Sequence, residues 1–166
     1  MKGIITALAC AAFFLPAIAF SSCAGAPPAA HNGAELNGAA FSDAEGREWF
    51  LSEIRRGAHT IRMDRRELSA YGFDGIYSIH FEDGRISGMG APNRFFGPYT
   101  VGGGGELAIG LLGHTMMMAL AEPADLREHE YFAYLSRVTR WNLREGRLEL
   151  YTSSDDGSET VFVFAP

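Results

Sequence analysis

The chain has 166 residues, of which 47% are hydrophobic, and it carries a formal net charge of −6 at pH 7. This length accommodates one ordinary domain around a single core and excludes two domains of comfortable size. An acidic chain of this kind lacks the excess of positive charge that binds nucleic acid, so we expect no nucleic-acid partner.

Residues 1–22 have the features of a secretory signal peptide. Lys2 supplies a positive start, and residues 4–20 form an apolar run that is short for a stable membrane span and has no charged stop-transfer flank. Two processing routes fit the small residues that follow. Residues 17–19 would serve a simple signal peptidase, whereas residues 20–23 resemble a relaxed lipobox with phenylalanine in place of the usual leucine.

The two cysteines favour the lipoprotein route. Cys10 lies inside the segment to be removed, which leaves Cys23 as an odd thiol in an oxidising compartment. Lipidation of Cys23 gives that thiol a role, and it would anchor the protein to a membrane surface without spanning it. The mature chain would then carry 13 basic against 20 acidic residues, a net charge of −7.

We therefore expect three segments in a cell-envelope protein, at the outer membrane or the periplasmic face. The signal peptide covers residues 1–22, a flexible tether rich in small residues and proline covers 23–44, and one folded domain covers 45–166.

The folded part opens with alternating apolar and polar residues that predict strands at 48–54 and 60–64, with Trp49 anchored in the core. The charged run at 65–67 indicates an exposed face or an irregular connection. Residues 76–82 and 85–88 form the clearest pair of strands, because Asp83 and Gly84 between them tolerate the positive φ values of a tight hairpin turn.

A glycine- and proline-punctuated corner follows. We expect it to leave regular strand geometry, because Pro92 and Pro98 lack the amide donor that a ladder needs. Asn93 is expected to hydrogen-bond the turn backbone. The glycines that would let this backbone bend are Gly88, Gly90 and Gly97. The aromatic residues expected to return to the core are Phe95, Phe96 and Tyr99.

The middle of the chain predicts a hairpin and then another apolar strand or extended segment at 115–120. Residues 102–105 would be the hairpin loop before a strand at 107–111. Three consecutive methionines at 116–118 suggest either a soft-metal surface or filler for an irregular core. We favour the core, with Met117 buried by alternation.

One helix is predicted over 123–137. Pro123 suits its first turn, acidic residues stand near its positive end, and apolar side chains recur at helical spacing. The apolar stripe consists of Tyr131, Tyr134, Leu135 and Val138.

Three more strands are expected at 141–143, 147–151 and 160–164, with turns at Glu145-Gly146 and at 154–157. The total is about eight short strands and one helix. We therefore predict a mainly β (α+β) fold, in which a small antiparallel, strongly curved sheet or barrel is packed against one helix.

The stretch from 85 to 120 resembles the core of the META domain, the family of the HslJ-like heat-inducible lipoproteins of bacteria. The resemblance rests on an Ile-Ser-Gly strand, a Gly-x-x-x-Asn-x-Phe-x-Gly-x-Tyr corner and a Thr-x-Met segment. The matching residues are Ile86, Ser87 and Gly88, then Gly90, Asn93, Phe95, Gly97 and Tyr99, and finally Thr115 and Met117. Similarity extends from about 49 to 164. The resemblance implies that many members of the family carry two cysteines placed to pair, one at the position of Ala91 and one after the Thr-x-Met segment. This chain has Ala91 and Leu120 or Ala119 there, so we expect no such crosslink.

We expect no catalytic, cofactor-binding or metal-binding residues and no cofactor. The histidines share no ligand spacing with one another or with cysteine, and no serine lies in a nucleophile elbow. The histidines are His31, His59, His80, His114 and His129. Asn93, Arg94 and Tyr99 are the best candidates for a functional surface, although backbone geometry explains the corner equally well, and we favour structure over binding.

The resemblance implies a non-enzymatic, lipid-anchored envelope protein, in stress tolerance or host interaction, that contacts the membrane through its anchor and an unknown envelope protein through its domain. An alternative is a carrier of a small apolar ligand in the barrel interior, which requires the aromatic residues to leave a cavity. An enzyme ranks last.

Overall fold

The computed structural model describes residues 39–119, 123–154 and 156–166. The expected signal peptide, Cys23 and most of the expected tether lie outside the described residues. Within the described ranges, no helix combines the length and the apolar character required to cross a bilayer.

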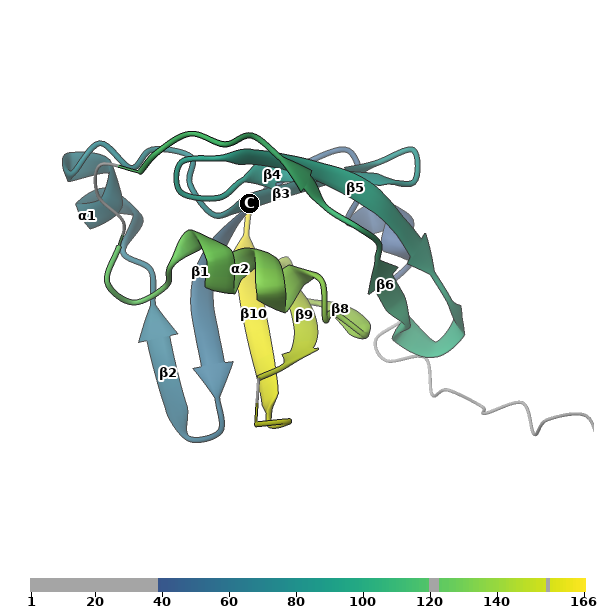
Figure 1. The fold of residues 1–166 in the computed structure, drawn as a ribbon. Coiled ribbons are helices and arrows are strands. Elements are labelled where there is room, and N and C mark those ends of the chain that lie inside the picture. Colours follow the sequence, from purple (N-terminus) through teal and green to yellow (C-terminus); the bar gives the residue numbers. More distant parts are fainter. Residues whose placement is uncertain (1–38, 120–122, 155) are drawn as a thin grey trace, which may run out of the picture. The chain divides into compact units, whose positions relative to one another are not determined.

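The described residues form one antiparallel sheet in the order β6-β5-β4-β3-β1-β10-β9-β8, with β2 paired to β1 and β7 paired to β5 (Figure 1). The strands are β1 (Glu48–Arg56), β2 (His59–Arg62), β3 (Ser78–Glu82), β4 (Arg85–Met89), β5 (Arg94–Val101), β6 (Leu107–Ile109), β7 (Gly113–His114), β8 (Arg140–Arg144), β9 (Arg147–Ser153) and β10 (Glu159–Ala165).

The two ends of this strand order meet. The backbone bridge between Glu106 and Arg140 joins the start of β6 to β8, and the Leu107 N–H donates to the Thr139 carbonyl at 3.0 Å. The sheet is therefore a nearly closed barrel, and the predicted fold class, a small curved antiparallel sheet or barrel with a packed helix, is confirmed.

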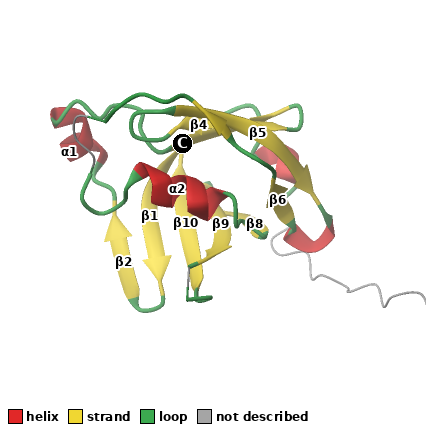
Figure 2. Ribbon diagram, viewed as in Figure 1, coloured by secondary structure: helices red, strands yellow, loops and turns green. Residues whose placement is uncertain are grey.

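The described helical segments are short (Figure 2). They are the α-helices α1 (Arg65–Ala70) and α2 (Glu128–Leu135) and the 3₁₀ turns η1 (Phe41–Asp43) and η2 (Gly103–Gly105). Helix α2 packs on β10, where the ring of Tyr131 stacks on Phe162 with centroids 6.0 Å apart.

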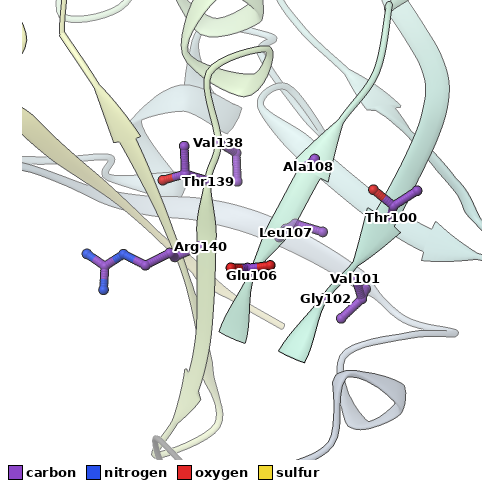
Figure 3. Close-up of a pocket in the computed structure, with 9 residues that line it drawn as sticks. All are labelled: Thr100, Val101, Gly102, Glu106, Leu107, Ala108, Val138, Thr139 and Arg140. Atoms are coloured by element: carbon purple, nitrogen blue, oxygen red, sulfur yellow. The ribbon is translucent and has the colours of Figure 1, made fainter. Parts of the chain in front are cut away.

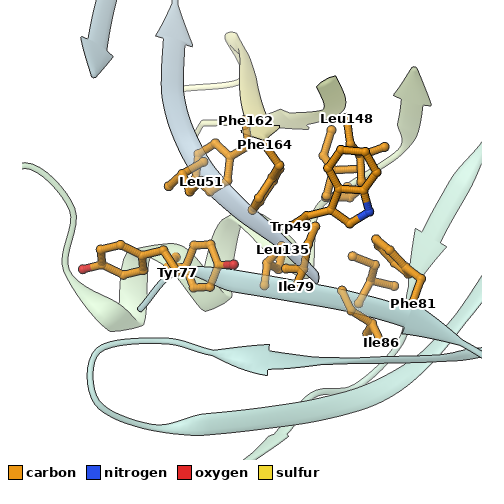
Figure 4. Close-up of a cluster of buried hydrophobic side chains, with 14 of the residues drawn as sticks. Trp49, Leu51, Tyr77, Ile79, Phe81, Ile86, Leu135, Leu148, Phe162 and Phe164 are labelled. Atoms are coloured by element: carbon orange, nitrogen blue, oxygen red, sulfur yellow. The ribbon is translucent and has the colours of Figure 1, made fainter. Parts of the chain in front are cut away.

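The core is filled by side chains from both halves of the sheet (Figure 4). Trp49 is fully buried as predicted, and its indole N–H donates to the Ala44 carbonyl at 2.8 Å. Phe41 also lies in the core, in edge-on contact with Phe81 and Trp141. The folded part therefore begins a few residues before the boundary expected at residue 45.

Both hairpin turns predicted from an acidic residue followed by glycine are present. Asp83 and Gly84 have φ values of 48° and 73°, and Glu145 and Gly146 have φ values of 53° and 72°. Positive φ at both central residues matches the right-handed twist of the flanking strands. These turns join β3 to β4 and β8 to β9.

The prediction that the chain cannot continue as a regular strand through Pro98 is wrong, because Pro98 lies inside β5. It faces Arg85 of β4, while its carbonyl accepts from the Gly110 N–H at 2.9 Å on the opposite side of the strand. The nitrogen of a strand residue points to the same side as its carbonyl. The nitrogen of Pro98 therefore points to the side of β5 that pairs with β7 and then with β6. Pro98 lies between these two short pairings, so its lack of an N–H removes no hydrogen bond between strands.

The prediction that Phe96 returns to the core is also wrong. Side chains alternate along β5, so Phe95 and Tyr99 are buried whereas Phe96 is 53% exposed. On the outer surface, the guanidinium of Arg85 lies 5.4 Å from the centre of the Phe96 ring.

Helix α1 replaces the irregular connection expected at 65–67. The Asp64 carboxylate accepts from the backbone N–H groups of Arg66 and Glu67, which caps the helix, and Glu67 stands three residues after the cap. Aspartate followed three residues later by glutamate is a sequence signal for a helix start, and it was missed here. Helix α2 is shorter than the predicted 123–137, because Arg127 is its N-cap residue and Ser136 its C-cap residue.

Residues 115–119 do not continue the sheet as a strand, and Met117 is not buried. Its exposed fraction is 61%, and its neighbours Met116 and Met118 are exposed by 93% and 86%. The preference for a core role of the methionines is therefore wrong.

Candidate functional site

Asn93 is the centre of the corner that carries the family resemblance. It is 5% exposed, and its side chain bonds three residues in two other parts of the chain, the segment after β7 and the start of α2. Its Oδ1 accepts from the Thr115 hydroxyl at 2.8 Å and from the Met117 N–H at 2.6 Å. Its Nδ2 donates to the Met117 carbonyl at 3.1 Å and to Glu128 Oε2 at 2.6 Å. The amide therefore acts as a substitute strand partner for Met117.

Glu128, at the start of α2, holds the other side of the corner. Its Oε1 accepts from the backbone N–H groups of Ala91 and Asn93, both at 2.6 Å. A carboxylate that accepts several charge-assisted hydrogen bonds is a strong local restraint. The pair Asn93 and Glu128 thus ties the β4–β5 connection to the segment after β7 and to α2.

Gly90 is required by this arrangement. A Cβ at that position would lie 2.6 Å from Glu128 Oε1 and 2.8 Å from the Phe132 ring. The space that a side chain would occupy is therefore already filled by the carboxylate and the helix.

The structure brings together three of the predicted motif residues, namely Asn93, Thr115 and Met117. Gly90 lies beside them in the corner, and the remaining motif residues belong to the sheet. Phe95 and Tyr99 are buried, and Arg94 is exposed, with its N–H donating to the Thr115 hydroxyl at 3.1 Å. The glycines Gly88 and Gly97 lie where the backbones of neighbouring segments approach closely. The residues of the motif therefore do not converge on one open pocket.

Tyr99 makes a separate contact with the segment before β1. Its hydroxyl donates to the carboxylate of Glu45. Burial, together with this hydrogen bond, raises the pKa of Tyr99 from 10.0 to about 12. Tyr99 is thus held in its neutral form as part of the packing between β5 and the chain entering the barrel.

A groove of about 390 Å³ lies along β3, β4 and β5, and both Arg94 and His80 line it. Strand register places Glu48, His80 and Ser87 in one row across β1, β3 and β4. An acid, an imidazole and a hydroxyl in a row have the residue types of a nucleophile relay. No hydrogen bond joins these three described side chains, so the aligned base and nucleophile of such a relay are not assembled.

A second pocket, of about 520 Å³, lies at the seam between β6 and β8 (Figure 3). Thr100 and Glu106 border it on one side, and Thr139 and Arg140 border it on the other. The pocket lies there because only a short stretch of β6 and β8 is paired, so the two strands do not fill the space at the seam.

The aromatic side chains of the barrel interior, where an apolar-ligand carrier would hold its ligand, pack against other side chains. Phe81 contacts Tyr99 edge-on at 5.0 Å between centroids, and Phe162 contacts Phe164 at 6.3 Å. Together with Phe95 they are buried in the core. Such contacts leave little room for a ligand at these rings.

Glu128 is the residue of the corner that the sequence did not predict, because among the acidic residues near the expected helix start nothing distinguished it. Glu128 lies three residues before Tyr131, on the side of the helix that faces the corner. Nothing in the sequence around Glu128 indicates that it bonds Asn93. Among the described residues, no group of three or more His, Cys, Asp or Glu side chains is placed to hold a metal ion.

The class of protein follows from the comparison with known families. Residues 42–165 match the META domain, so the chain belongs to the META domain family. The predicted family is thereby confirmed, and the barrel with its Asn93 corner is the fold of that domain in this chain.

Two solved structures share the fold. A protein from Burkholderia xenovorans, solved by NMR, aligns with a TM-score of 0.56 at 20% identity over 78% of this chain and 89% of its own. A DUF4847 family protein from Bacteroides vulgatus aligns with a TM-score of 0.50 at 14% identity, over 75% and 95% of the two chains. No curated protein matches the chain.

Proposed function

We propose that this protein is a lipid-anchored, non-enzymatic component of the cell envelope whose META domain acts through contacts with another envelope protein. Its role would lie in envelope stress tolerance or host interaction. The N-terminal sequence with Cys23 supports the anchor, and the resemblance to HslJ-like lipoproteins supports the physiological setting.

The observation that carries the contact role is the internal use of the polar groups at the family's corner. The Asn93 amide bonds Thr115, Met117 and Glu128, and the Glu128 carboxylate bonds two backbone N–H groups. A carboxylate and an amide that make this many hydrogen bonds within the domain support a structural role for the corner, which leaves the outer surface of the domain for partner contacts.

The outer face of β5 and the adjoining segment supply apolar surface for a protein partner. Phe96 is 53% exposed on the outer face of β5, and Leu111, in the segment between β6 and β7, is 92% exposed. Large apolar side chains exposed in this way are candidates for a protein contact. Arg85, stacked on Phe96, would add a polar rim.

The anchor is tested by metabolic labelling with a palmitate analogue in the native host. We expect the wild-type chain to be labelled and recovered with membranes, and the Cys23→Ser variant to be unlabelled. Label that persists in Cys23→Ser would contradict lipidation at this residue.

The envelope role is tested by complementation of a deletion strain exposed to heat and to envelope-damaging compounds. We expect the wild-type gene to restore survival, and the double variant Phe96→Ser/Leu111→Ser to fail while it is still labelled and folded. Glu82→Gln, an exposed change elsewhere on the same sheet, is the matched control. Equal survival of the deletion strain and its parent would contradict the stress role. Restoration by the double variant would contradict the contact surface.

A further inference from the structure

The groove of about 390 Å³ along β3, β4 and β5 is lined by two neighbouring rows of side chains on the outer face of the sheet. Residues paired across adjacent strands, and residues two apart along one strand, point to the same face. The first row consists of Glu48, His80, Ser87 and Phe96, and the second row consists of Ser78, Met89 and Arg94. All seven residues line the groove, so the register of the sheet accounts for its composition.

The polar side chains of these two rows are not used inside the domain, unlike those of the Asn93 corner. None of them makes a hydrogen bond or an ion pair with another described residue. Ser78 is the most telling of them, because it is only 1% exposed and yet its hydroxyl has no partner among the described residues. The Tyr131 hydroxyl bonds the backbone carbonyl of Ser78, not its side chain. Buried polar groups are nearly always hydrogen-bonded, so this hydroxyl requires a partner from the groove.

The chemistry of the lining selects a neutral ligand that is rich in hydroxyl groups. Glu48 only accepts hydrogen bonds and Arg94 only donates them, whereas each serine hydroxyl does both. A simple anion would be repelled by Glu48 and a simple cation by Arg94, and an apolar ligand would leave the polar side chains without partners. A sugar hydroxyl both donates and accepts. The C–H groups of a sugar ring suit the apolar part of the lining, which is Met89 together with Phe96.

We propose that this groove binds a neutral carbohydrate of more than one sugar ring. The row from Glu48 to Phe96 crosses four neighbouring strands, a length of roughly 14 Å, so a chain of sugar rings can lie across the strands. The side chains of Ser78, His80 and Ser87 bond its hydroxyl groups. This inference does not depend on the anchor or on the protein partner proposed above, although Phe96 borders both surfaces.

The test titrates the purified, ¹⁵N-labelled full chain with maltotriose, cellotriose and triacetylchitotriose and follows the amide signals by NMR. We expect at least one of these saccharides to shift the amide signals of β3, β4 and β5 around the groove, with a Kd on the order of 1 mM. Added sodium chloride should leave the affinity unchanged, because the ligand carries no charge. Triglycine, a zwitterion that could bridge Glu48 and Arg94, should not bind.

Ser78→Ala, His80→Ala and Ser87→Ala should each lower the affinity by about threefold to tenfold, the effect of one lost hydrogen bond. Glu82→Ala is the matched control, since Glu82 follows His80 on the same face of β3 and lies outside the groove, and it should bind like the wild type. Leu111→Ser, which alters the proposed protein-contact surface outside the groove, should also leave the affinity unchanged.

Circular dichroism checks that each variant is folded. The proposal is overturned if none of the three saccharides binds, or if triglycine binds the groove as tightly as they do. It is also overturned if His80→Ala/Ser87→Ala binds like the wild type, or if Glu82→Ala weakens binding as much as His80→Ala does.

Discussion

Asn93 and Glu128 show how two side chains fix a bend that the backbone cannot fix by itself. The connection from β4 to β5 turns through Ala91 and Pro92, and proline has no N–H to donate. Glu128 accepts from the amides on either side of the proline, those of Ala91 and Asn93. The Asn93 side-chain amide then bonds both the N–H and the carbonyl of Met117, as the backbone of a neighbouring strand would. The corner is therefore stabilised by contacts distant in sequence.

Glu128→Gln tests this description. Glutamine places an amide donor where the carboxylate now accepts from three N–H groups, so at least one donor loses its partner. We expect the free energy of unfolding to fall by about 2 kcal/mol, because hydrogen bonds to a charged group are stronger than neutral ones. Urea unfolding of the full chain measures it.

Glu130→Gln is the matched control on the same helix. Glu130 accepts from the Arg127 N–H at the exposed helix start, the one hydrogen bond that its carboxylate makes to the described residues. We expect a loss of about 0.5 kcal/mol. Equal losses for the two variants would contradict a special role for Glu128.

Tyr99 predicts a dependence of stability on alkaline pH. Its pKa is raised to about 12 by burial and by the Glu45 hydrogen bond, whereas a tyrosine in the unfolded chain titrates near 10. Between these pH values the unfolded chain releases a proton that the folded chain keeps. Stability contributed by Tyr99 is therefore complete below pH 10 and is lost as the pH rises toward 12.

Tyr99→Phe should flatten the fall in the free energy of unfolding between pH 10 and 12, as followed by urea unfolding at several pH values. Tyr71→Phe, which changes a tyrosine that is 72% exposed, should retain the wild-type slope. Identical slopes for Tyr99→Phe and the wild type would be inconsistent with a raised pKa of Tyr99 in the folded state.

At the scale of single residues, the sequence predicted that Asn93 bonds backbone near a turn, but not which backbone. Its partner Met117 is 24 positions away, and Glu128 is 35 positions away. A local motif restricts only local conformation. The pairing of Asn93 with Glu128 depends on where α2 packs, and no pattern in either segment encodes that position.

At the scale of elements, the β3–β4 hairpin depends on close contact between strands. A Cβ at Gly88 would lie 2.0 Å from the Ser78 carbonyl oxygen and 2.9 Å from the Phe95 ring. Such a contact requires the backbone of β3 to move. Glycine at this position therefore permits β4 to approach its neighbours.

Gly88→Ala should destabilise the protein by about 3 kcal/mol, at the upper end for an added methyl group in a packed site. Gly103→Ala is the control, because a Cβ there meets no atom within 4 Å. We expect that change to stay within about 0.5 kcal/mol of the wild type. Thermal or urea unfolding distinguishes the two, and similar midpoints would show that β3 and β4 can adjust.

Elements with a strong local signal were predicted from the sequence, and those that depend on their neighbours were not. The turns at Asp83-Gly84 and Glu145-Gly146 require positive φ values, and an acidic residue followed by glycine is a local sequence signal for such turns. Pro98 in β5 was misjudged because the cost of a missing donor depends on which side of the strand has a partner. Helix α1 does carry a local start signal at Asp64 and Glu67, but its six residues are too few for an apolar helical pattern to support that signal.

At the scale of the whole folded unit, the barrel has one weak line of closure. On one side, β10 is paired to both β1 and β9 over most of its length. Across the seam, β6 and β8 are joined by the bridge of Glu106 with Arg140 and by the Leu107 N–H. Local opening is expected first where few backbone bonds hold the strands together.

Hydrogen exchange tests this expectation. The Leu107 amide should exchange faster than the amides of β10 under native conditions, because the seam can open without unfolding the core. Mass spectrometry or NMR of the full chain resolves the two segments. Equal protection would indicate that the barrel opens only by global unfolding.

Barrel closure was anticipated from the number of short strands and the family resemblance, but the strands that meet at the seam were not. Closure between β6 and β8 joins residues more than thirty positions apart, with α2 between them. Composition and alternation indicate only that the sheet buries one face. Which strands meet at the seam, and in which register, depends on how the whole domain packs.

The central position of β10 also governs when the protein can fold during its synthesis. Of the described strands, β10 is the last to leave the ribosome, yet Ser52 in β1 donates to Val163 in β10 across 111 positions of the chain. Until β10 emerges, β1 and β9 each lack the strand that lies between them. The entropy cost of closing the long loop from β1 to β9 is then not offset by the contacts that β10 makes with both strands. A nascent chain of this design cannot complete its barrel until β10 has been synthesised, even though nine of the ten described strands precede it.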